Sequence, residues 1–211
     1  MSYFPENMTD RYRRFKHRNF APNQDHYEQL AADGQSPQVM LVSCCDSRVD
    51  PETIFQAMPG ELFVVRNVAN LVPPYETSGM YHGVSAALEF AALNLRVRHI
   101  IVLGHSGCGG VRACLEHTHR ETEAQFIRNW MSMLDDARDK ILADPTLKPG
   151  LAQRSALEQE GIKTSLANLR TFPCIQTLEG RGRISLHGAY FDISTGTLSV
   201  LNSSANAFVA A

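Results

Sequence analysis

Two short runs of apolar, β-forming residues, at 39–43 and 98–104, each end in residues that can bind a soft metal ion. The first passes into CCDSR at 44–48 and the second into HSGCGG at 105–110. Such runs predict buried strands, and the helical spacing of small and apolar residues at 79–95 predicts a buried helix between them. Because α/β sheets bind ligands beyond the carboxyl ends of their strands, we expect both motifs at one functional edge.

The other patterns complete an α/β fold, in which a mostly parallel central β-sheet is flanked by helices and has an antiparallel edge strand. A further strand is expected at 61–66. Helices are expected at about 121–143 and 151–169, separated by the breaker DPTLKPG. Strands at about 183–192 and 197–201 are expected to close the chain as a hairpin.

The N-terminal segment differs in composition from the rest of the chain. Residues 1–36 are polar and aromatic, and a basic run at 11–18 precedes a helical pattern. We interpret the basic run as a solvated helix face, because acidic residues elsewhere balance it. The sequence therefore predicts an N-terminal helical arm at 1–36 and one α/β domain at 37–211, which carries the metal-binding motifs.

Composition narrows the classes of partner and the expected compartment. The formal net charge of −2 leaves no global positive field, which argues against nucleic acid as a partner. No apolar run approaches the roughly 18 residues of a membrane-spanning helix, and the N-terminus lacks the apolar core of a signal peptide. The five cysteines are an odd number, so reduced, metal-bound or catalytic thiols are expected rather than a disulfide framework. We therefore expect a cytoplasmic protein without a membrane partner.

Cys44, His105 and Cys108 form the candidate metal site. Thiolate and imidazole ligands suit Zn²⁺, and three protein ligands leave a fourth position open, as in catalytic zinc sites. Strand alternation points Cys44 and the adjacent Cys45 to opposite faces, so we expect only one of them to reach the ion, but alternation does not decide which. A second, less favoured cluster has helical spacing: Cys114, His117 and His119.

These motifs, together with VVRNVAN at 64–70 and LHGAYFDI at 186–193, resemble those of the β-carbonic anhydrases. The resemblance implies one Zn²⁺ per subunit, held by the three residues named above, and a catalytic dyad of Asp46 and Arg48 beside it. It implies reversible hydration of CO2 to bicarbonate by zinc-bound hydroxide, because zinc lowers the pKa of its bound water. Asp46 would accept the hydroxide proton as a hydrogen bond, and Arg48 would hold the carboxylate with its planar fork.

Finer features resemble the plant-like, open-site members of this family. Gln35, nine residues before Cys44, matches a glutamine that helps to bind substrate there, and the residues that match the substrate cleft are Phe63, Val68 and Phe90. Phe90 replaces a tyrosine, so one orienting hydroxyl is missing. The family's cleft lies between subunits, which implies a homodimer or larger homo-oligomer, with the arm wrapped on the partner.

A bicarbonate-regulated form of the family is disfavoured. In those members a second bicarbonate pocket uses a tryptophan, an arginine and a tyrosine. At the matching positions this chain has Leu41, Arg66 and Phe191, so only the arginine is present.

Two alternative functions remain open from the sequence. The same zinc site could hydrolyse carbon disulfide or carbonyl sulfide, since related proteins do so. A non-catalytic zinc protein is less favoured, because it would give Asp46 and Arg48 no task. Three histidines that could shuttle protons are expected to be structural: His82, His99 and His187.

Overall fold

The computed structural model describes residues 4–118 and 123–211. By its internal contacts the chain divides into two compact units, Met1–Ser36 and Pro37–Ala211.

The smaller unit is helical. Its elements are α1 (Glu6–Phe15), the π-helical turn η1 (Lys16–Phe20), the 3-10 turn η2 (Ala21–Asn23) and α2 (Gln24–Asp33). Tyr27 of α2 packs against Phe20 and Phe15, with ring centroids 4.9 and 6.4 Å away. Gly34 ends α2 with a φ of 78°, a left-handed value that glycine adopts without strain.

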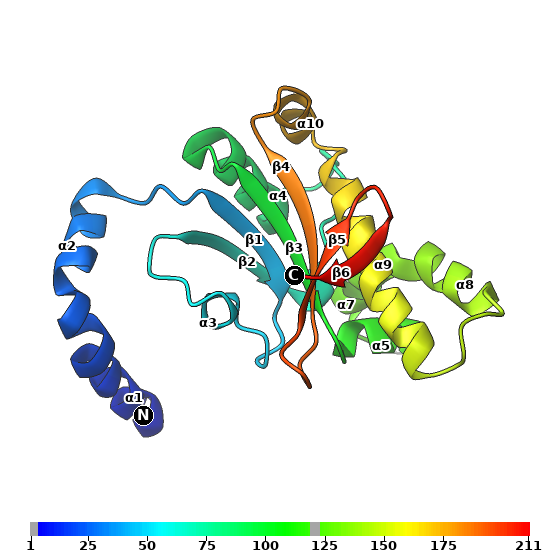
Figure 1. Ribbon diagram of the computed structural model, residues 1–211, viewed down its shortest axis with the longest axis horizontal. Helices are drawn as coiled ribbons and strands as arrows, with labels where there is room; N and C mark the ends of the chain where they lie inside the picture. The colour runs from blue at the N-terminus through cyan, green and yellow to red at the C-terminus, as the bar shows by residue number, and fades with distance from the viewer. Residues whose placement is uncertain (1–3, 119–122) are drawn as a thin grey trace. The chain divides into compact units, whose positions relative to one another are not determined.

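The larger unit is built on one six-stranded sheet (Figure 1). Its elements in chain order are β1 (Val39–Cys44), α3 (Pro51–Ile54), β2 (Leu62–Asn67), the 3-10 turn η3 (Val68–Asn70), α4 (Gly83–Glu89), the π-helical turn η4 (Phe90–Leu95), β3 (His99–His105), α5 (Gly109–Leu115), α7 (Gln125–Met131), the 3-10 turn η5 (Ser132–Leu134), α8 (Asp135–Ala143), α9 (Leu151–Leu169), α10 (Pro173–Gly180), β4 (Ser185–Phe191), β5 (Leu198–Asn202) and β6 (Ala207–Ala210).

The strand order is β2-β1-β3-β4-β5-β6. The first four of these strands are parallel neighbours, and β5 and β6 continue the sheet in antiparallel pairing. The predicted α/β fold class is therefore confirmed. Cys44 lies level with Asn67 of β2, and Ser43 lies level with Leu103 of β3, so the carboxyl ends of β1, β2 and β3 meet at one edge.

Alternation along the central strands supplies both faces of the sheet with apolar side chains. Met40 and Ile100 pack in the larger core with Ile162 of α9, which lies along β3 and β4 in Figure 1. Leu41 and Leu103 belong to a smaller cluster on the opposite face, where α3 packs. All four strand residues are at most 2% exposed, which explains why these strands appear as continuous apolar runs in the sequence.

Several predicted boundaries were wrong. The helix predicted at 79–95 begins at Gly83, because Gly79 has a φ of 90° and the residues after it are not helical. The described part of the helix predicted at 121–143 is interrupted at η5, where the Ser132 hydroxyl donates to the Asn129 carbonyl oxygen, a bond that competes with the helix. Residues 121–122 lie outside the described residues.

Two elements were missed. The predicted hairpin does not close the chain, because β6 pairs with β5 after a turn in which Asn202 Oδ1 accepts from the Ser204 and Ala205 amides. Only four residues long, β6 has too little pattern to be recognised. The helix α10 begins at Pro173, a favourable first position because proline has no N–H to leave unpaired.

Over residues 4–118 and 123–211, every helix is too short or too polar to traverse a lipid bilayer.

Candidate active site and metal centre

Three soft ligands converge where β1 and β3 end. Cys44 is the last residue of β1, His105 is the last residue of β3, and Cys108 lies in the turn before α5. The sulfur atoms of Cys44 and Cys108 are 4.0 Å apart, and one ligand atom from each of the three residues lies within 4.8 Å of the others. All three residues are at most 5% exposed. Parallel pairing of β1 with β3 therefore brings the three predicted zinc ligands together.

Cys44, rather than Cys45, belongs to this cluster. Cys44 is buried and Cys45 is exposed, as expected for successive residues that point in opposite directions at a strand end. The Cys45 amide donates to the Asn67 carbonyl oxygen at 2.8 Å, which extends the pairing between β1 and β2 by one residue. The structure thus decides a question that periodicity left open.

The hydrogen bonding of the His105 ring leaves one of its nitrogen atoms available to bind a metal ion. The Nδ1 atom of His105 donates to the Ser106 carbonyl oxygen at 3.0 Å, which leaves the lone pair of the neutral ring on Nε2. Nε2 is buried and has no hydrogen-bond partner among the residues that the structure describes. A buried, unpaired imidazole nitrogen beside two sulfur atoms has the donor set and orientation that zinc requires.

Hydrogen bonds to the sulfur atoms favour thiolate at Cys44. Its pKa is lowered chiefly by the hydrogen bond from the Cys108 thiol, with further help from the nearby His105 side chain and from the Asp46 and Ala69 amides, although burial opposes the shift. The pKa of Cys108 is raised by the same contact and by burial. The unliganded pair therefore keeps one proton, which metal binding must displace.

Asp46 and Arg48 form a tight pair beside the cluster. Oδ1 of Asp46 accepts from the Arg48 amide at 3.0 Å and from Arg48 Nε at 2.9 Å, and Oδ2 accepts from Arg48 Nη2 at 2.7 Å. The same Nη2 donates to the Gly107 carbonyl oxygen at 3.2 Å, so Arg48 joins the loop after β1 to the loop after β3. The Arg48 guanidinium holds the pKa of Asp46 well below its usual range, so this carboxyl group is ionised.

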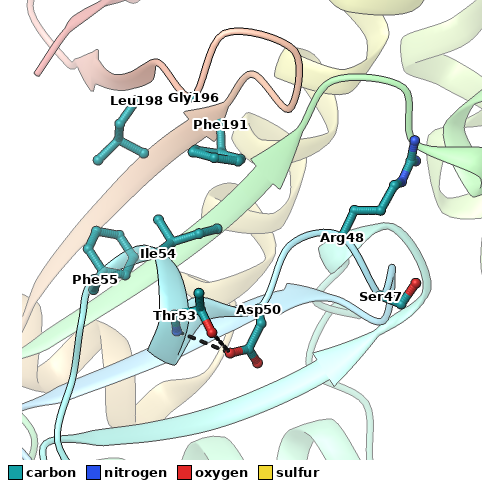
Figure 2. A pocket seen from close by; sticks show the side chains of 9 residues that line it. All are labelled: Ser47, Arg48, Asp50, Thr53, Ile54, Phe55, Phe191, Gly196 and Leu198. Carbon is teal, nitrogen blue, oxygen red and sulfur yellow. Dashed lines mark hydrogen bonds between the residues drawn. The ribbon is translucent and has the colours of Figure 1, made fainter.

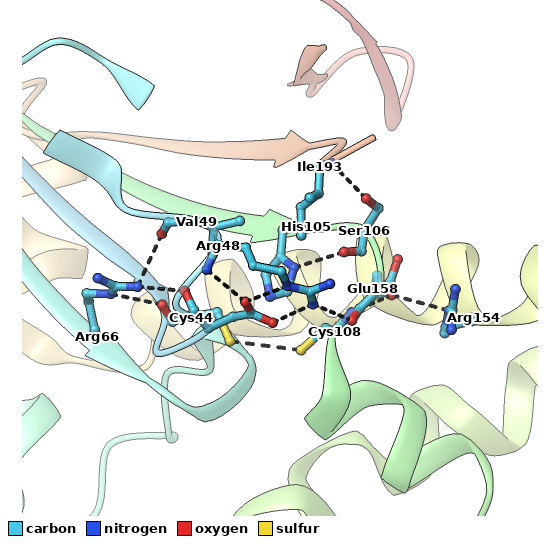
Figure 3. A network of polar contacts seen from close by, with 12 residues as sticks. Cys44, Arg48, Val49, Arg66, His105, Ser106, Cys108, Arg154, Glu158 and Ile193 are labelled. Atoms are coloured by element: carbon cyan, nitrogen blue, oxygen red, sulfur yellow. Dashed lines mark hydrogen bonds and ion pairs between the residues drawn. The ribbon is translucent and has the colours of Figure 1, made fainter. Parts of the chain in front are cut away.

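Arg66 of β2 fixes the backbone of the first loop (Figure 3). Its guanidinium donates to three carbonyl oxygens, of Cys44 at 3.0 Å, Asp46 at 2.8 Å and Val49 at 3.3 Å. It also pairs with Asp50, at 3.2 Å. Arg66 was noted in the sequence only as a match to a bicarbonate pocket, and the structure shows it engaged in holding the loop that carries Cys44 and Asp46.

The turn η3 supports the site from the side of β2. Ala69 and Asn70 are both buried and have left-handed φ values of 62° and 49°, which are uncommon for residues other than glycine. The chain holds this turn with side chains from distant helices: Trp130 Nε1 donates to the Val68 carbonyl oxygen at 2.8 Å, and the Ser165 hydroxyl donates to the Asn70 carbonyl oxygen at 3.2 Å. These bonds hold the turn whose Ala69 amide donates to the Cys44 sulfur.

The predicted substrate-lining residues do not all meet within one chain. The rings of Phe63 and Phe90 are in contact, with centroids 5.9 Å apart. Phe63 lies level with Met40, however, and four residues of strand, about 13 Å, separate it from the level of Cys44. Val68 lies in η3, beside the metal cluster, and is 36% exposed. Gln35 is exposed and belongs to the smaller unit, so its predicted role stays a prediction.

A cavity of about 530 Å³ is lined by Arg48 of the loop after β1, by residues of α3 and by Phe191 of β4 (Figure 2). Three of its polar side chains are already paired: Thr53 donates to Asp50 from both its amide and its hydroxyl, and Arg48 is bonded to Asp46. Phe191 lines this cavity without a hydroxyl group, and Leu41 is fully buried. That a second bicarbonate pocket is disfavoured stays a prediction.

The alternative metal cluster and the other histidines have ordinary surroundings. Cys114 is buried in the core, His117 is exposed, and His119 lies outside the described residues. Among the residues that the structure describes, one group of three metal-binding side chains is close enough to share an ion, and it is the cluster at Cys44. A ring nitrogen of His82 lies 2.7 Å from the Ser78 carbonyl oxygen, and His99 and His187 bond to each other at 3.1 Å.

Two residues of the site escaped the sequence analysis. Trp130 contacts the backbone of the turn η3, and Glu158 contacts the backbone of the loop that carries Cys108, each from a helix distant in the chain. Each lies in an ordinary helical pattern, and the sequence contains no local signal that distinguishes it. The one unusual feature is that Glu158 is a charged residue on a helix position that packs inward, which only the burial in the folded chain reveals.

Comparison with known proteins identifies the family. Residues 39–198 match the carbonic anhydrase family model. Among curated relatives in Arabidopsis thaliana, chloroplastic β-carbonic anhydrase 5 is 36% identical over 187 residues, which are 89% of this chain and 61% of that protein. β-Carbonic anhydrase 3 is 35% identical over 87% of this chain and 71% of its own length. The chain thus spans somewhat less than two thirds of the first relative.

Solved structures agree with these relatives. The β-carbonic anhydrase CcaA superposes with a TM-score of 0.91 at 32% identity, covering 98% of this chain and 91% of that one. The enzyme CafA of Aspergillus fumigatus gives a TM-score of 0.79 at 29% identity, with 93% and 91% covered. The family model, the curated relatives and the solved structures all indicate one family, and the cluster of Cys44, His105 and Cys108 is a metal-binding site that fits it. The chain therefore belongs to the β-class carbonic anhydrases.

Proposed function

We propose that this protein interconverts CO2 and bicarbonate at a zinc ion held by Cys44, His105 and Cys108, with Asp46 and Arg48 as its catalytic dyad. The observation that carries the proposal is that Arg48 connects the dyad to both parts of the metal site. Asp46 and Arg48 lie two and four residues after Cys44, and Arg48 also donates to the loop that carries His105 and Cys108. Zinc, when bound there, would act as a Lewis acid that lowers the pKa of water, so that hydroxide is available near neutral pH as the nucleophile for CO2.

The hydrogen bonds of Asp46 define what its carboxylate can do. A carboxylate oxygen accepts about two hydrogen bonds, and Oδ1 already has two from Arg48 while Oδ2 has one. Oδ2 therefore keeps one acceptor site. Because the pKa of Asp46 is held low, the carboxylate acts as an acceptor at neutral pH, and it can orient a reacting water molecule through that site.

A homodimer is the smallest assembly that we propose to be competent. Phe63 and Phe90 contact each other away from the metal cluster of their own chain, so a cleft that contains all the predicted lining residues requires a second copy. The second face of the sheet supports pairing, since Val64, Ile101 and Leu198 on it are only partly buried. The relatives from Sordaria macrospora are described as tetrameric.

The arm offers a second apolar surface for such pairing. Four of its side chains lie at helical spacing and are 40–71% exposed: Phe4, Met8, Tyr12 and Phe15. We propose that this stripe packs on a partner subunit. A chain shortened to residues 37–211 should then show a smaller assembly by light scattering.

We propose the cytoplasm as the compartment. All five cysteines lie within the described residues, and none of them forms a disulfide. Reduced thiols agree with a reducing compartment. Two of the relatives are chloroplastic and mitochondrial proteins, so fractionation of the source cells is the direct test.

The activity is tested by stopped-flow CO2 hydration on zinc-loaded protein across pH 6 to 9, with metal content measured on the same sample. Two thiolates cancel the charge of Zn²⁺, so we expect a rate that rises on the alkaline side. Stoichiometric zinc without CO2 hydration at any pH would contradict the proposal. Sulfide release from carbonyl sulfide or carbon disulfide by that sample would then assign the alternative hydrolase.

A further inference from the structure

A buried carboxylate from α9 reaches the loop that carries two of the metal ligands. Glu158 is 3% exposed, and its Oε1 accepts from the backbone amide of Cys108 at 3.0 Å (Figure 3). The Gly107 amide also contacts this carboxylate. Fifty positions along the chain separate Glu158 from Cys108, so the contact depends entirely on how α9 packs against the sheet.

The other side of the same carboxylate is held by the sheet. Oε2 of Glu158 accepts from the Tyr190 hydroxyl at 2.8 Å, and Tyr190 is a buried residue of β4. Arg154, one helical turn before Glu158, lies 3.7 Å from Oε1. A carboxylate is costly to bury unless its oxygens are hydrogen-bonded, and both oxygens of Glu158 are. This geometry orients the carboxylate toward the loop from a rigid support.

The loop itself needs an external support. Gly107 has a φ of 72°, and Cys108 is the N-cap residue of α5, but its sulfur is committed to the metal cluster. Arg48 holds this loop from one side through the Gly107 carbonyl oxygen. Glu158 holds it from the other side through the amide groups, so the loop is fixed between a guanidinium and a carboxylate.

We propose that Glu158, braced by Tyr190, is a positioning residue that sets the metal affinity of the site by fixing the Cys108 backbone. The inference rests on the proposed zinc site and adds a determinant outside its ligands and its dyad. Hydrogen-bonded groups behind metal ligands typically change metal affinity by 10-fold to 100-fold when they are mutated, because they orient the ligands.

The test compares three variants of the full chain: Glu158→Gln, Tyr190→Phe and, as a control, Glu160→Gln. The control makes the same chemical change on the same helix, but Glu160 pairs with Lys163 at 3.4 Å and is about 40% exposed. Each metal-free protein is titrated with Co²⁺ against a chromophoric chelator, and the thiolate-to-cobalt and ligand-field absorption bands are recorded. Circular dichroism and thermal unfolding without metal are measured in parallel.

Glu158→Gln is expected to weaken Co²⁺ binding by about 10-fold to 100-fold and to shift the ligand-field bands. Tyr190→Phe should change both in the same direction by a smaller factor, and Glu160→Gln should match the parent within twofold. A change of thermal stability alone, with parental Co²⁺ affinity and spectra in folded Glu158→Gln, would overturn the inference. If Glu158→Gln does not fold, parental affinity and spectra in Tyr190→Phe would overturn it.

The two proposals fail differently. A parent chain that binds Co²⁺ with thiolate bands but, loaded with zinc, does not hydrate CO2 would overturn the proposed activity alone. A parent chain that binds no Co²⁺ would overturn both.

Discussion

Arg48 donates two parallel hydrogen bonds to Asp46, from Nε to Oδ1 at 2.9 Å and from Nη2 to Oδ2 at 2.7 Å. A planar guanidinium can make this paired contact and a lysine ammonium cannot. We therefore expect Arg48→Lys to lower kcat/KM for CO2 hydration by about 10-fold to 100-fold, because the carboxylate loses its fixed orientation. Zinc content should stay stoichiometric, and both are measured on one preparation.

The control for this variant is Arg170→Lys. Arg170 makes a similar two-pronged contact with Glu179, at 2.8 and 3.0 Å, away from the metal cluster. Its replacement should leave kcat/KM unchanged. Equal rates for Arg48→Lys and the parent would show that the paired contact is not needed.

Zinc should stabilise the chain only when Cys44 is present. At a free zinc concentration about 1,000 times the dissociation constant, binding to the folded state contributes about 4 kcal/mol to the free energy of unfolding. Metal-free parent protein should therefore show a large rise in melting temperature on adding zinc, whereas Cys44→Ser should show little or none. Differential scanning fluorimetry with and without chelator measures this rise.

The neighbouring cysteine provides a matched control, since Cys45 is exposed while Cys44 is buried. Cys45→Ser should keep stoichiometric zinc and the full rise in melting temperature. Loss of zinc in Cys45→Ser, with retention in Cys44→Ser, would reverse the assignment of the ligand.

Two adjacent glycines at the start of α5 should respond differently to alanine. A Cβ atom on Gly110 would lie 2.8 Å from Val68 Cγ1, whereas one on Gly109 would meet no atom within 4 Å. Neither glycine has a left-handed φ, so packing alone separates them. We expect Gly110→Ala to lower the free energy of unfolding by about 1–3 kcal/mol. Gly109→Ala should be neutral or stabilise the chain by up to about 1 kcal/mol, through the unfolded chain's lower entropy.

Urea unfolding of metal-free protein measures both glycine variants. If the two variants had the same free energy of unfolding, the close approach of α5 to the turn η3 would not limit the side-chain size at position 110.

Asp50 should contribute a pH-dependent part of the stability. Its pKa is lowered chiefly by the hydrogen bond from the Thr53 hydroxyl, and Arg66 adds an attractive charge. A carboxyl group with a lowered folded-state pKa stabilises the fold above its unfolded-state pKa of about 3.9, and that contribution is lost as pH falls through the folded-state value. At neutral pH Asp50→Asn should therefore be less stable than the parent, by at most about 1 kcal/mol because solvent screens this 44% exposed side chain.

The difference between parent and Asp50→Asn should shrink below pH 4 in urea unfolding of metal-free protein. Thr53→Val removes the hydrogen bond that is the main cause of the lowered pKa of Asp50. This variant should therefore show a smaller pH-dependent change in the free energy of unfolding than the parent. A difference that stays constant from pH 7 to pH 3 would exclude a charge effect at Asp50.

The sequence alone determined the fold class, the places of the main strands along the chain and the two motifs that carry the metal-binding residues. Local patterns suffice for these features, because apolar runs such as 39–43 and 98–104 predict buried strands. Cysteine and histidine at the ends of these runs indicate a site for a soft metal ion. The same patterns failed at Gly79, at the break in η5 and at β6, where a single backbone angle, a side-chain bond or a four-residue strand decides the outcome.

Only the tertiary structure decided which cysteine joins the cluster and what supports it. Alternation says that Cys44 and Cys45 point apart, but burial of one of them depends on the pairing of β1 with β2 and β3. The supports at Trp130 and Glu158 are separated by 62 and 50 positions from the backbone groups that they contact. Contacts of this range leave no local pattern in the chain, because the packing of helices on the sheet, rather than the neighbouring residues, brings the partners together.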